Sequence, residues 1–238
     1  MTSVIKTSEL DKDQVRRKAF LATVRKALGH DPERPSPKPD SRPQRLDRLL
    51  RQVDIDSPQM VSRWIEKASS NGMTVMHADT QSVADSVIEY LRQQHVRCVM
   101  INFSANPVPS LDSCLTHAGF ELHRWGDTDC VEKVFQCDAS VTDCRCAMAD
   151  SGGFLVWSDS FFGRSTTLTT SVHVVLIPED LIGADLIDAM PRMAADNDGA
   201  IPSYAVVING PSKTSDIEMK LVTGVHGPKY VCAVVIKR

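Results

Sequence analysis

Hydrophobic residues follow two patterns along this chain. In some segments they recur at steps of three and four residues, which is typical of helices with one buried face. In other segments they form short continuous runs, which are typical of strands covered on both faces. The stepped pattern predicts helices over residues 11–28, 57–72, 80–94, 109–117 and 181–193. The runs predict strands over residues 73–77, 97–103, 120–125, 154–157, 172–177, 205–208 and 231–236.

The order of these elements indicates the fold class. Strands that alternate with helices are usually joined by right-handed crossovers in a parallel sheet. The sequence therefore predicts an α/β fold, with a mostly parallel sheet flanked by helices. Five prolines fall within residues 30–43, and they predict an extended linker because proline fixes φ and lacks a backbone donor. We expect a helical arm over residues 1–29, this linker over 30–43 and the α/β domain over 44–238.

Composition and charge narrow the class of protein. Of the 238 residues, 42% are hydrophobic and 24% are charged, as in ordinary globular domains. The net charge of −3 gives no reason to expect nucleic acid as a partner. Positive charges concentrate before residue 49, where they indicate a solvated helix or, alternatively, a surface for an acidic partner or membrane. Because no apolar segment has the length of a signal-peptide core or a membrane span, the sequence predicts a cytoplasmic protein.

The cysteines give no pattern of a metal or disulfide protein. The seven cysteines lie at positions 98, 114, 130, 137, 144, 146 and 232. Their number is odd, and their spacing is not that of a secreted disulfide framework. No Cys-x-x-Cys pair is present, so we expect neither an iron–sulfur cluster nor a structural zinc site. The sequence therefore predicts no metal and no cofactor in this chain.

Three glycine-bearing segments next to predicted strands are candidates for chemistry, because ligands bind outside the carboxyl ends of parallel strands. The first segment is residues 149–153, which leads into the strand at 154–157. Asp150 and Ser151 would supply a carboxylate and a hydroxyl, and Gly152 and Gly153 would let the backbone approach a ligand. The alternative is an Asx turn that only reverses the chain.

The second segment, residues 210–218, is expected to open a helix after the strand at 205–208. Lys213 and the free N–H groups of a helix start would attract a small anion. The alternative is ordinary helix capping by Ser212 or Thr214. The candidate ligand-binding residues here are Gly210, Ser212, Lys213, Thr214 and Asp216.

The third segment, residues 224–228, places His226 beside Gly227 in an open turn, where a histidine can act as an acid or base, or be structural. A fourth candidate is Arg164, which can present its guanidinium to a carboxylate or phosphate or form a structural ion pair. We expect Arg164, Lys213 and Asp150 to meet at one electropositive pocket. Asp150, Glu218 and His226 are the candidate proton carriers there.

Two of these segments together resemble the signature of the LUD domain, and the chain is similar to the lactate utilisation protein C family (LutC or YkgG). Residues 210–218 read GPSKTSDIE, where the family has GPS-R/K-T-x-DIE, and residues 224–228 read GVHGP. Residues 149–153 read ADSGG where the family has A-E/D-T-G-T, so Ser151 and Gly153 depart from it. Thr169 and Thr170 also depart, since they stand where the family has Leu-Pro, while His173 fits.

The resemblance implies a fold like that of the sugar-phosphate isomerases and CoA transferases (NagB/RpiA/CoA transferase-like). It also implies an accessory, non-redox role beside iron–sulfur partner proteins that oxidise L-lactate to pyruvate. It supplies no catalytic mechanism, so whether the chain is an enzyme stays open. Two alternatives are a stand-alone binder or enzyme for a hydroxy acid, sugar phosphate or CoA ester, and a regulatory or structural subunit. A homo-oligomer also stays open.

Overall fold

The computed structural model describes residues 4–29, 59–159, 162–197, 202–214 and 222–237. The chain divides into two units, residues 1–48 and 49–238. In the first unit, α1 (Val4–Ala27) confirms the predicted helix and begins earlier than the apolar pattern indicated. The predicted linker over 30–43 lies outside the described residues, so the domain boundaries stay a prediction.

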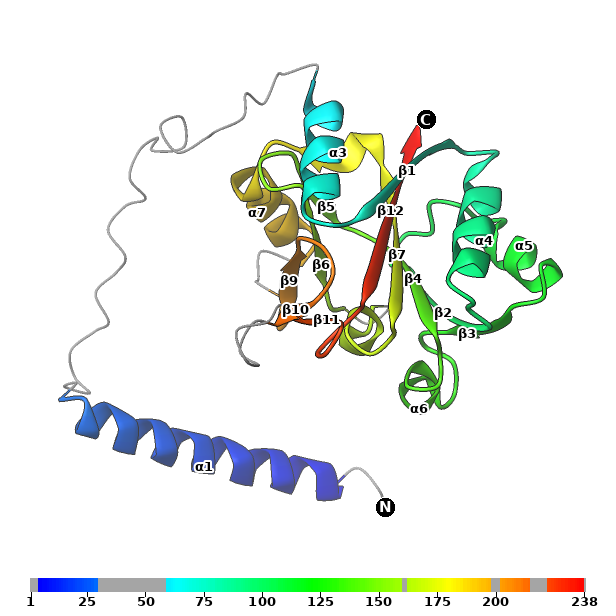
Figure 1. The fold of residues 1–238 in the computed structure, drawn as a ribbon. Helices are drawn as coiled ribbons and strands as arrows, with labels where there is room; N and C mark the ends of the chain where they lie inside the picture. The colour runs from blue at the N-terminus through cyan, green and yellow to red at the C-terminus, as the bar shows by residue number, and fades with distance from the viewer. Residues whose placement is uncertain (1–3, 30–58, 160–161, 198–201, 215–221, 238) are drawn as a thin grey trace. The chain divides into compact units, whose positions relative to one another are not determined.

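The second unit is built on a sheet of six parallel strands in the order β1-β12-β7-β4-β2-β3 (Figure 1). The strands are β1 (Thr74–Asp79), β12 (Tyr230–Lys237), β7 (Val172–Pro178), β4 (Ala139–Asp143), β2 (Cys98–Asn102) and β3 (Glu121–Arg124). The α/β class with a mostly parallel central sheet is therefore confirmed.

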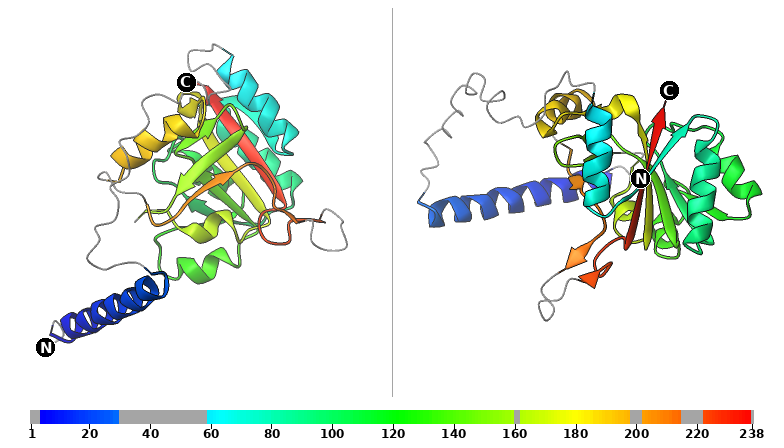
Figure 2. Two further views of the ribbon diagram at one scale, coloured as in Figure 1. Left: turned by 90° about the vertical axis from the view of Figure 1, so that its left-hand side faces the viewer. Right: turned by 45° about the horizontal axis from the view of Figure 1, so that its top comes forward.

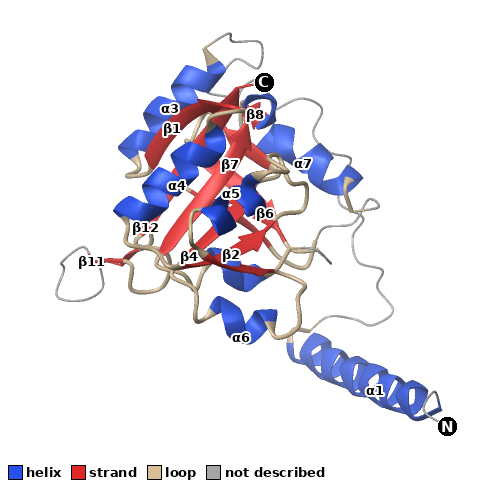
Figure 3. Cartoon of the chain, turned by 90° about the vertical axis from the view of Figure 1, so that its right-hand side faces the viewer, coloured by secondary structure: helices blue, strands red, loops and turns tan. Residues whose placement is uncertain are grey.

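Helices cover one face of this sheet. Figure 3 shows α4 (Val83–Gln93) and α5 (Leu111–His117) in front of the strands. Their buried side chains, such as Val87 and Leu115, pack with alternate strand residues, such as Val174 and Val234. This face is an ordinary α/β core, in which every second residue of each strand turns toward the helices.

The opposite face is covered by α3 (Met60–Ser70) and by a second sheet in the order β8-β5-β6-β9. These strands are β8 (Ile182–Gly183), β5 (Cys146–Met148), β6 (Gly153–Trp157) and β9 (Ala205–Ile208). On its far side the second sheet packs against α7 (Leu186–Ala195), as the left view in Figure 2 shows. The unit is therefore layered as helices, sheet, sheet and helix.

Two predicted strands belong to this second sheet instead of the parallel one. β6 pairs antiparallel with both β5 and β9. The reason is the short connection between β5 and β6, since a tight turn can join only antiparallel neighbours. β6 reads as a continuous apolar run because it is enclosed between α3 with the main sheet on one side and α7 on the other. β9 lies at the edge of the second sheet and is only partly buried.

The prediction that a helix begins within residues 210–214 is also wrong. Lys213–Thr214 forms strand β10, which pairs antiparallel with β11 (Val222–Thr223). Residues 215–221 lie outside the described residues. The hydroxyl-rich stretch before them resembles a helix cap, but its backbone is fixed by neighbouring loops: the Ser212 N–H donates to the Pro228 carbonyl, and the Ser212 carbonyl accepts from Gly224.

Other differences concern short or polar elements. α7 begins at Leu186, capped by the Asp185 carboxylate, because residues 179–183 form a 3₁₀ turn (Glu179–Leu181) and β8. Strand β4 and the short helix α6 (Cys130–Val134) have no predicted counterpart. β4 has the sequence Ala-Ser-Val-Thr-Asp and is buried throughout. Because three of these five residues are polar, the segment lacks the continuous apolar run that predicts a central strand. No helix in the described part of the chain combines the length and apolar character needed to cross a membrane.

Candidate functional site

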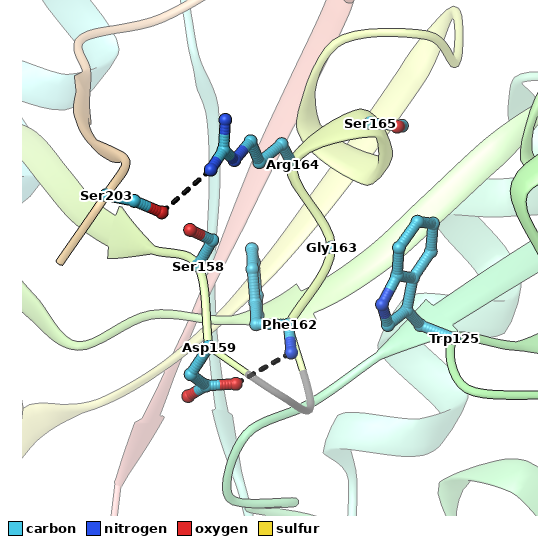
Figure 4. A pocket seen from close by; sticks show the side chains of 8 residues that line it. All are labelled: Trp125, Ser158, Asp159, Phe162, Gly163, Arg164, Ser165 and Ser203. Carbon is cyan, nitrogen blue, oxygen red and sulfur yellow. Dashed lines mark hydrogen bonds between the residues drawn. The ribbon is translucent and has the colours of Figure 1, made fainter. Parts of the chain in front are cut away.

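A cavity of about 420 Å³ lies around Arg164, between the two sheets' strand ends (Figure 4). Trp125 follows directly after β3, and Ser158 and Asp159 follow directly after β6. Ser203 precedes β9, which runs antiparallel to β6 and so begins at the same end. The lining residues are Trp125, Ser158, Asp159, Phe162, Gly163, Arg164, Ser165 and Ser203. We call this the Arg164 pocket.

The turn that carries Arg164 is anchored to the main sheet by a buried side chain. Asn102, the last residue of β2, donates from Nδ2 to the Gly163 carbonyl (3.2 Å) and to Thr166 Oγ1 (2.6 Å). Arg164 begins the 3₁₀ helix η1 (Arg164–Thr167). A Cβ atom at Gly163 would collide with the indole of Trp125, so a glycine is required there for the two segments to approach.

The guanidinium of Arg164 is held at the surface of the pocket. Its Nη2 donates to Ser203 Oγ (2.7 Å), and the guanidinium lies 5.5 Å from the centre of the Tyr204 ring. Asp159 accepts a hydrogen bond from the Phe162 N–H (2.8 Å) and forms an ion pair with Arg145. The pocket therefore combines a guanidinium, a neutralised carboxylate and several hydroxyls, which is a set of groups suited to a small hydroxy acid.

The topology places this pocket where α/β sheets bind ligands. From β2 the chain continues to β3 on one side, and from β4 it continues toward β7 on the other. Connections that leave neighbouring strands in opposite directions open a crevice at their carboxyl ends. Asp143, the last residue of β4, closes part of it by accepting hydrogen bonds from Ser104 and Ala105, and burial raises its carboxyl pKa.

The predicted meeting of Arg164, Lys213 and Asp150 is wrong. Gly153 and Trp157 are the two ends of β6, about 13 Å apart for a strand of this length. Arg164 lies at the Trp157 end, whereas Lys213 and the 149–153 turn lie at the Gly153 end. The glycine-bearing turns therefore do not share a crevice with Arg164. Because β6 and β9 are antiparallel, the turn before β6 and the turn after β9 lie together at the opposite end of β6.

The 149–153 turn and Lys213 both contact the end of helix α3. Asn71, the residue that caps α3, donates from Nδ2 to the Ser151 carbonyl (2.8 Å), and its own carbonyl accepts from Lys213 Nζ (2.9 Å). A cation at the carboxyl end of a helix is favourable because the helix dipole is negative there. Lys213 thus makes a structural contact in this fold, and a ligand for it stays a prediction.

Close packing explains the glycines around this contact. Gly152 has a φ of +70°, and a Cβ atom there would overlap the backbone of Lys67 and Ala68. A Cβ atom at Gly210 would lie 2.8 Å from the Asn71 carbonyl oxygen. The Trp64 indole, buried on the inner side of α3, donates to the Gly153 carbonyl (2.9 Å). This arrangement supports a structural, chain-reversing role for residues 149–153. The turn is not an Asx turn, however, because the Gly152 N–H donates to the Met148 carbonyl and the Gly153 N–H donates to Ser151 Oγ (3.3 Å).

Of the remaining predicted residues, those that the structure describes do not line the Arg164 pocket. Gly227 packs on Ser212, where its Cβ atom would lie 3.2 Å from the serine Cβ, and His226 beside it is exposed. Thr214 is half-buried in β10, and Asp216 and Glu218 lie outside the described residues. Asp150 is half-buried, and its Oδ1 is buried without a hydrogen-bond partner among the described residues. Its role as a proton carrier stays a prediction.

Because of His173, the second residue of β7, we expect the protein to lose stability in acid. His173 is fully buried, its Nε2 bonds Thr142 Oγ1 (2.9 Å), and burial lowers its pKa from 6.5 to about 4. Between these values the unfolded chain binds more protons than the folded one, so the free energy of unfolding should fall as the pH drops from about 6.5 to 4, by about 3 kcal/mol in all. Urea unfolding across this range measures it.

The matched variants are His173→Gln, which should flatten the fall, and His226→Gln, which changes an exposed histidine and should not. The raised pKa of Asp143 acts in the opposite direction and reduces the net slope in all three proteins equally. An identical fall in wild type and His173→Gln would contradict the assignment.

Sequence reasoning missed most of the pocket wall, although part of it carried a signal. Ser158 and Asp159 follow the predicted strand 154–157 directly, and Trp125 ends the predicted strand 120–125, so the rule about carboxyl ends could have found them. Ser203 carried no such signal, because it precedes a strand and reaches the pocket only through antiparallel pairing.

Comparison with known proteins identifies the family to which this chain is similar. The family model of the LUD domain matches residues 61–236. Lactate utilization protein C of Shouchella clausii is 32% identical over 130 residues, which cover 53% of this chain and 56% of that protein. Lactate utilization protein C of Bacillus subtilis is 33% identical over 100 residues, which cover 41% of this chain and 42% of that protein. The chain thus spans about half the length of the curated relatives it matches.

One solved structure shows the same fold. A DUF162 family protein from Deinococcus radiodurans aligns with a TM-score of 0.57 and 18% sequence identity, over 75% of this chain and 96% of that one. At this identity the likeness concerns the fold alone, and a relation to sugar-phosphate isomerases and CoA transferases stays a prediction. Because the domain match extends over most of the chain, the chain belongs to the LUD domain family.

Proposed function

We propose that this chain is the accessory component of an L-lactate utilisation system and that its Arg164 pocket binds a small hydroxy-acid or keto-acid anion. Membership of the LUD domain family and similarity to proteins named Lactate utilization protein C support the role in lactate use. The observation that carries the binding part is the position of Arg164 in a cavity at the topological switch point of the sheet.

The groups of the pocket match the two ends of such an anion. A guanidinium can hold a carboxylate through two parallel N–H donors, and the Arg164 guanidinium already donates from Nη2 to Ser203. The hydroxyls of Ser158 and Ser165 suit the hydroxyl or keto oxygen of the ligand. The volume of about 420 Å³ exceeds the size of one lactate, so the pocket also has room for a segment of a partner protein.

Oxidation of L-lactate to pyruvate removes two electrons and two protons, one proton from the C–H bond of the hydroxyl-bearing carbon and one from its hydroxyl group. We assign the acceptance of these electrons to iron–sulfur partner proteins, as the resemblance to the family implies, and the binding of the anion to this chain. Helix α1 is a candidate contact with such partners, since it carries exposed apolar side chains, Val15, Phe20 and Leu21, among basic residues.

Titration calorimetry with L-lactate, D-lactate, pyruvate and inorganic phosphate tests the binding site. Arg164→Ala should weaken binding of the preferred anion by about ten- to a hundredfold, because hydrogen bonds to charged groups contribute roughly 1.5–3 kcal/mol each. The matched control is Lys213→Ala, which removes a cation at the other end of β6 and should leave the affinity unchanged. The opposite result, with Lys213 required and Arg164 dispensable, would move the site to the glycine-bearing turns.

Growth tests the role in the cell. Deleting the gene in a host without a substitute pathway should prevent growth on L-lactate, and the Arg164→Ala gene should restore growth less well than the Lys213→Ala gene. Normal growth on L-lactate after the deletion would contradict the proposed function. Co-purification of the full chain with cluster-bearing proteins, weakened by deleting residues 1–29, would support the part given to α1.

A further inference from the structure

A cluster of sulfur and nitrogen ligands lies outside the Arg164 pocket. Cys98 is the first residue of β2, His123 lies in β3, and Cys137 lies just before β4. One ligand atom from each residue lies within 4.8 Å of the others, and the two Sγ atoms are 3.1 Å apart. Both thiols are buried and His123 is half-buried. Residues from three separate parts of the chain thus converge on one point.

The register of the parallel strands accounts for this convergence. Cys98 pairs with Glu121 and Met100 pairs with His123, so all four side chains lie on the same face of the sheet. This face is the one covered by α6, where Cys98, Met100, Val134 and Cys137 pack together.

The backbone around Cys137 is fixed independently of the sulfur atoms. The Asp138 carboxylate accepts hydrogen bonds from the N–H groups of Arg97 (2.8 Å) and Cys98 (3.1 Å). The Asp138 N–H in turn donates to the Cys98 carbonyl (3.0 Å). The two thiols are therefore held next to each other by main-chain contacts, which is how a preformed metal site is built.

The donor set is that of a zinc site. Two thiolates and one imidazole are soft and borderline ligands that Zn²⁺ prefers over the oxygen ligands of Mg²⁺ or Ca²⁺. The Glu121 carboxylate lies 3.0 Å from Nε2 of His123, and a carboxylate on one ring nitrogen commonly orients a histidine that binds metal. Burial raises the pKa of both thiols.

An alternative for such a pair is a disulfide. A disulfide has an S–S bond of about 2.05 Å, and the Cys98 and Cys137 sulfurs are 3.1 Å apart as free thiols. A disulfide would also leave His123 and Glu121 without a part in the cluster. The presence of the imidazole favours a metal, because only a metal uses all three groups.

We propose that Cys98, His123 and Cys137 bind one zinc ion, with solvent in the fourth position and Glu121 orienting the His123 ring, and that this ion ties strands β2, β3 and β4 together. The two cysteines bind the ion as thiolates and the histidine binds it as a neutral imidazole, so metal binding releases the two thiol protons to solvent. The site goes beyond the proposed function and does not depend on it. It departs from the expectation drawn from the cysteine spacing, because its ligands are adjacent only in the folded sheet.

The test is the metal content of the full chain, purified without a histidine tag under reducing conditions from cells supplied with zinc. Elemental analysis should find close to one zinc per chain in the wild type. Cys98→Ser and Cys137→Ser should lose it, whereas the matched control Cys114→Ser should keep it, since Cys114 lies on α5 at the opposite face of the sheet.

A second measurement does not depend on the folding of the variants. Cobalt added to the wild-type protein after zinc removal should give thiolate-to-cobalt charge-transfer absorption and a tetrahedral visible spectrum, and zinc should displace it. Zinc should also protect two of the thiols from a thiol reagent in the folded protein. Wild-type protein that takes up neither metal, or that is isolated without metal and with a Cys98–Cys137 disulfide, would overturn the proposal.

Discussion

Replacing Gly152 by alanine should destabilise the α/β unit by about 2–5 kcal/mol. Two effects add at this position. The φ of +70° is unfavourable for any residue with a Cβ atom, and that atom would also overlap the backbone of Lys67 and Ala68 in α3. Because the obstacle is main chain and not the end of a flexible side chain, α3 has to shift away from the sheet. Urea or thermal unfolding measures the loss.

Gly119→Ala is the matched control, because Gly119 also has a positive φ (+91°) but nothing lies within 4 Å of its Cβ position. It should show only the backbone part of the cost, about 1–2 kcal/mol. Equal destabilisation by the two substitutions would show that the contact between the 149–153 turn and α3 contributes nothing.

Replacing Trp64 by alanine should have an effect of similar size, about 3–5 kcal/mol. Trp64 is fully buried and packs in the core formed by α3, the second sheet and the main sheet. Its indole also satisfies the Gly153 carbonyl (2.9 Å), which truncation would leave without that donor. The loss should appear as a lower urea midpoint with little change in the slope of the transition.

Trp64→Phe separates the two contributions, since it keeps most of the packing and removes the indole N–H. It should cost about 1–2 kcal/mol, the usual range for a hydrogen bond lost at a buried carbonyl. If phenylalanine were as destabilising as alanine, the hydrogen bond to Gly153, and not the packing, would dominate the contact.

Both predictions concern the contact between α3 and the 149–153 turn, and they indicate a structural part for this turn. The 149–153 turn, Gly210 and Lys213 all meet the carboxyl end of α3 through Asn71 and its neighbours. Among the described residues that line the cavity, Arg164 supplies the guanidinium, at the other end of β6. A substitution in the turns that abolishes function therefore has to be compared with its effect on stability before it is assigned to a ligand.

The main sheet and its helices could be predicted from the sequence because their burial is local in origin. Strands β2, β7 and β12 are enclosed on both faces, so they read as continuous apolar runs, and α4 and α5 bury one stripe each. Strand β4 could not be predicted in this way. Its Ser140 and Thr142 are buried but bond to Thr170 and His173, which come later in the chain, so its polar composition makes sense only with those partners.

The candidate site was predicted in part. Arg164 was chosen for its chemistry, and the structure places it in the cavity. Lys213 and Asp150 were chosen on the same grounds, and the direction of β6 separates them from it. Likewise, cysteine spacing indicated no metal, whereas strand register sets Cys98, His123 and Cys137 together.

The α/β class, the membership of the LUD domain family and the chemical identity of the candidate groups can all be obtained from the amino-acid sequence. These follow from local apolar patterns and from short motifs, which are properties of neighbouring residues. Which of these groups share a site depends on the tertiary structure. Strand direction and register bring residues that are distant in the sequence into contact, and the local pattern of hydrophobic and polar residues carries no signal of these contacts. For that reason Arg164 lies with Trp125 and Ser203, and not with Lys213.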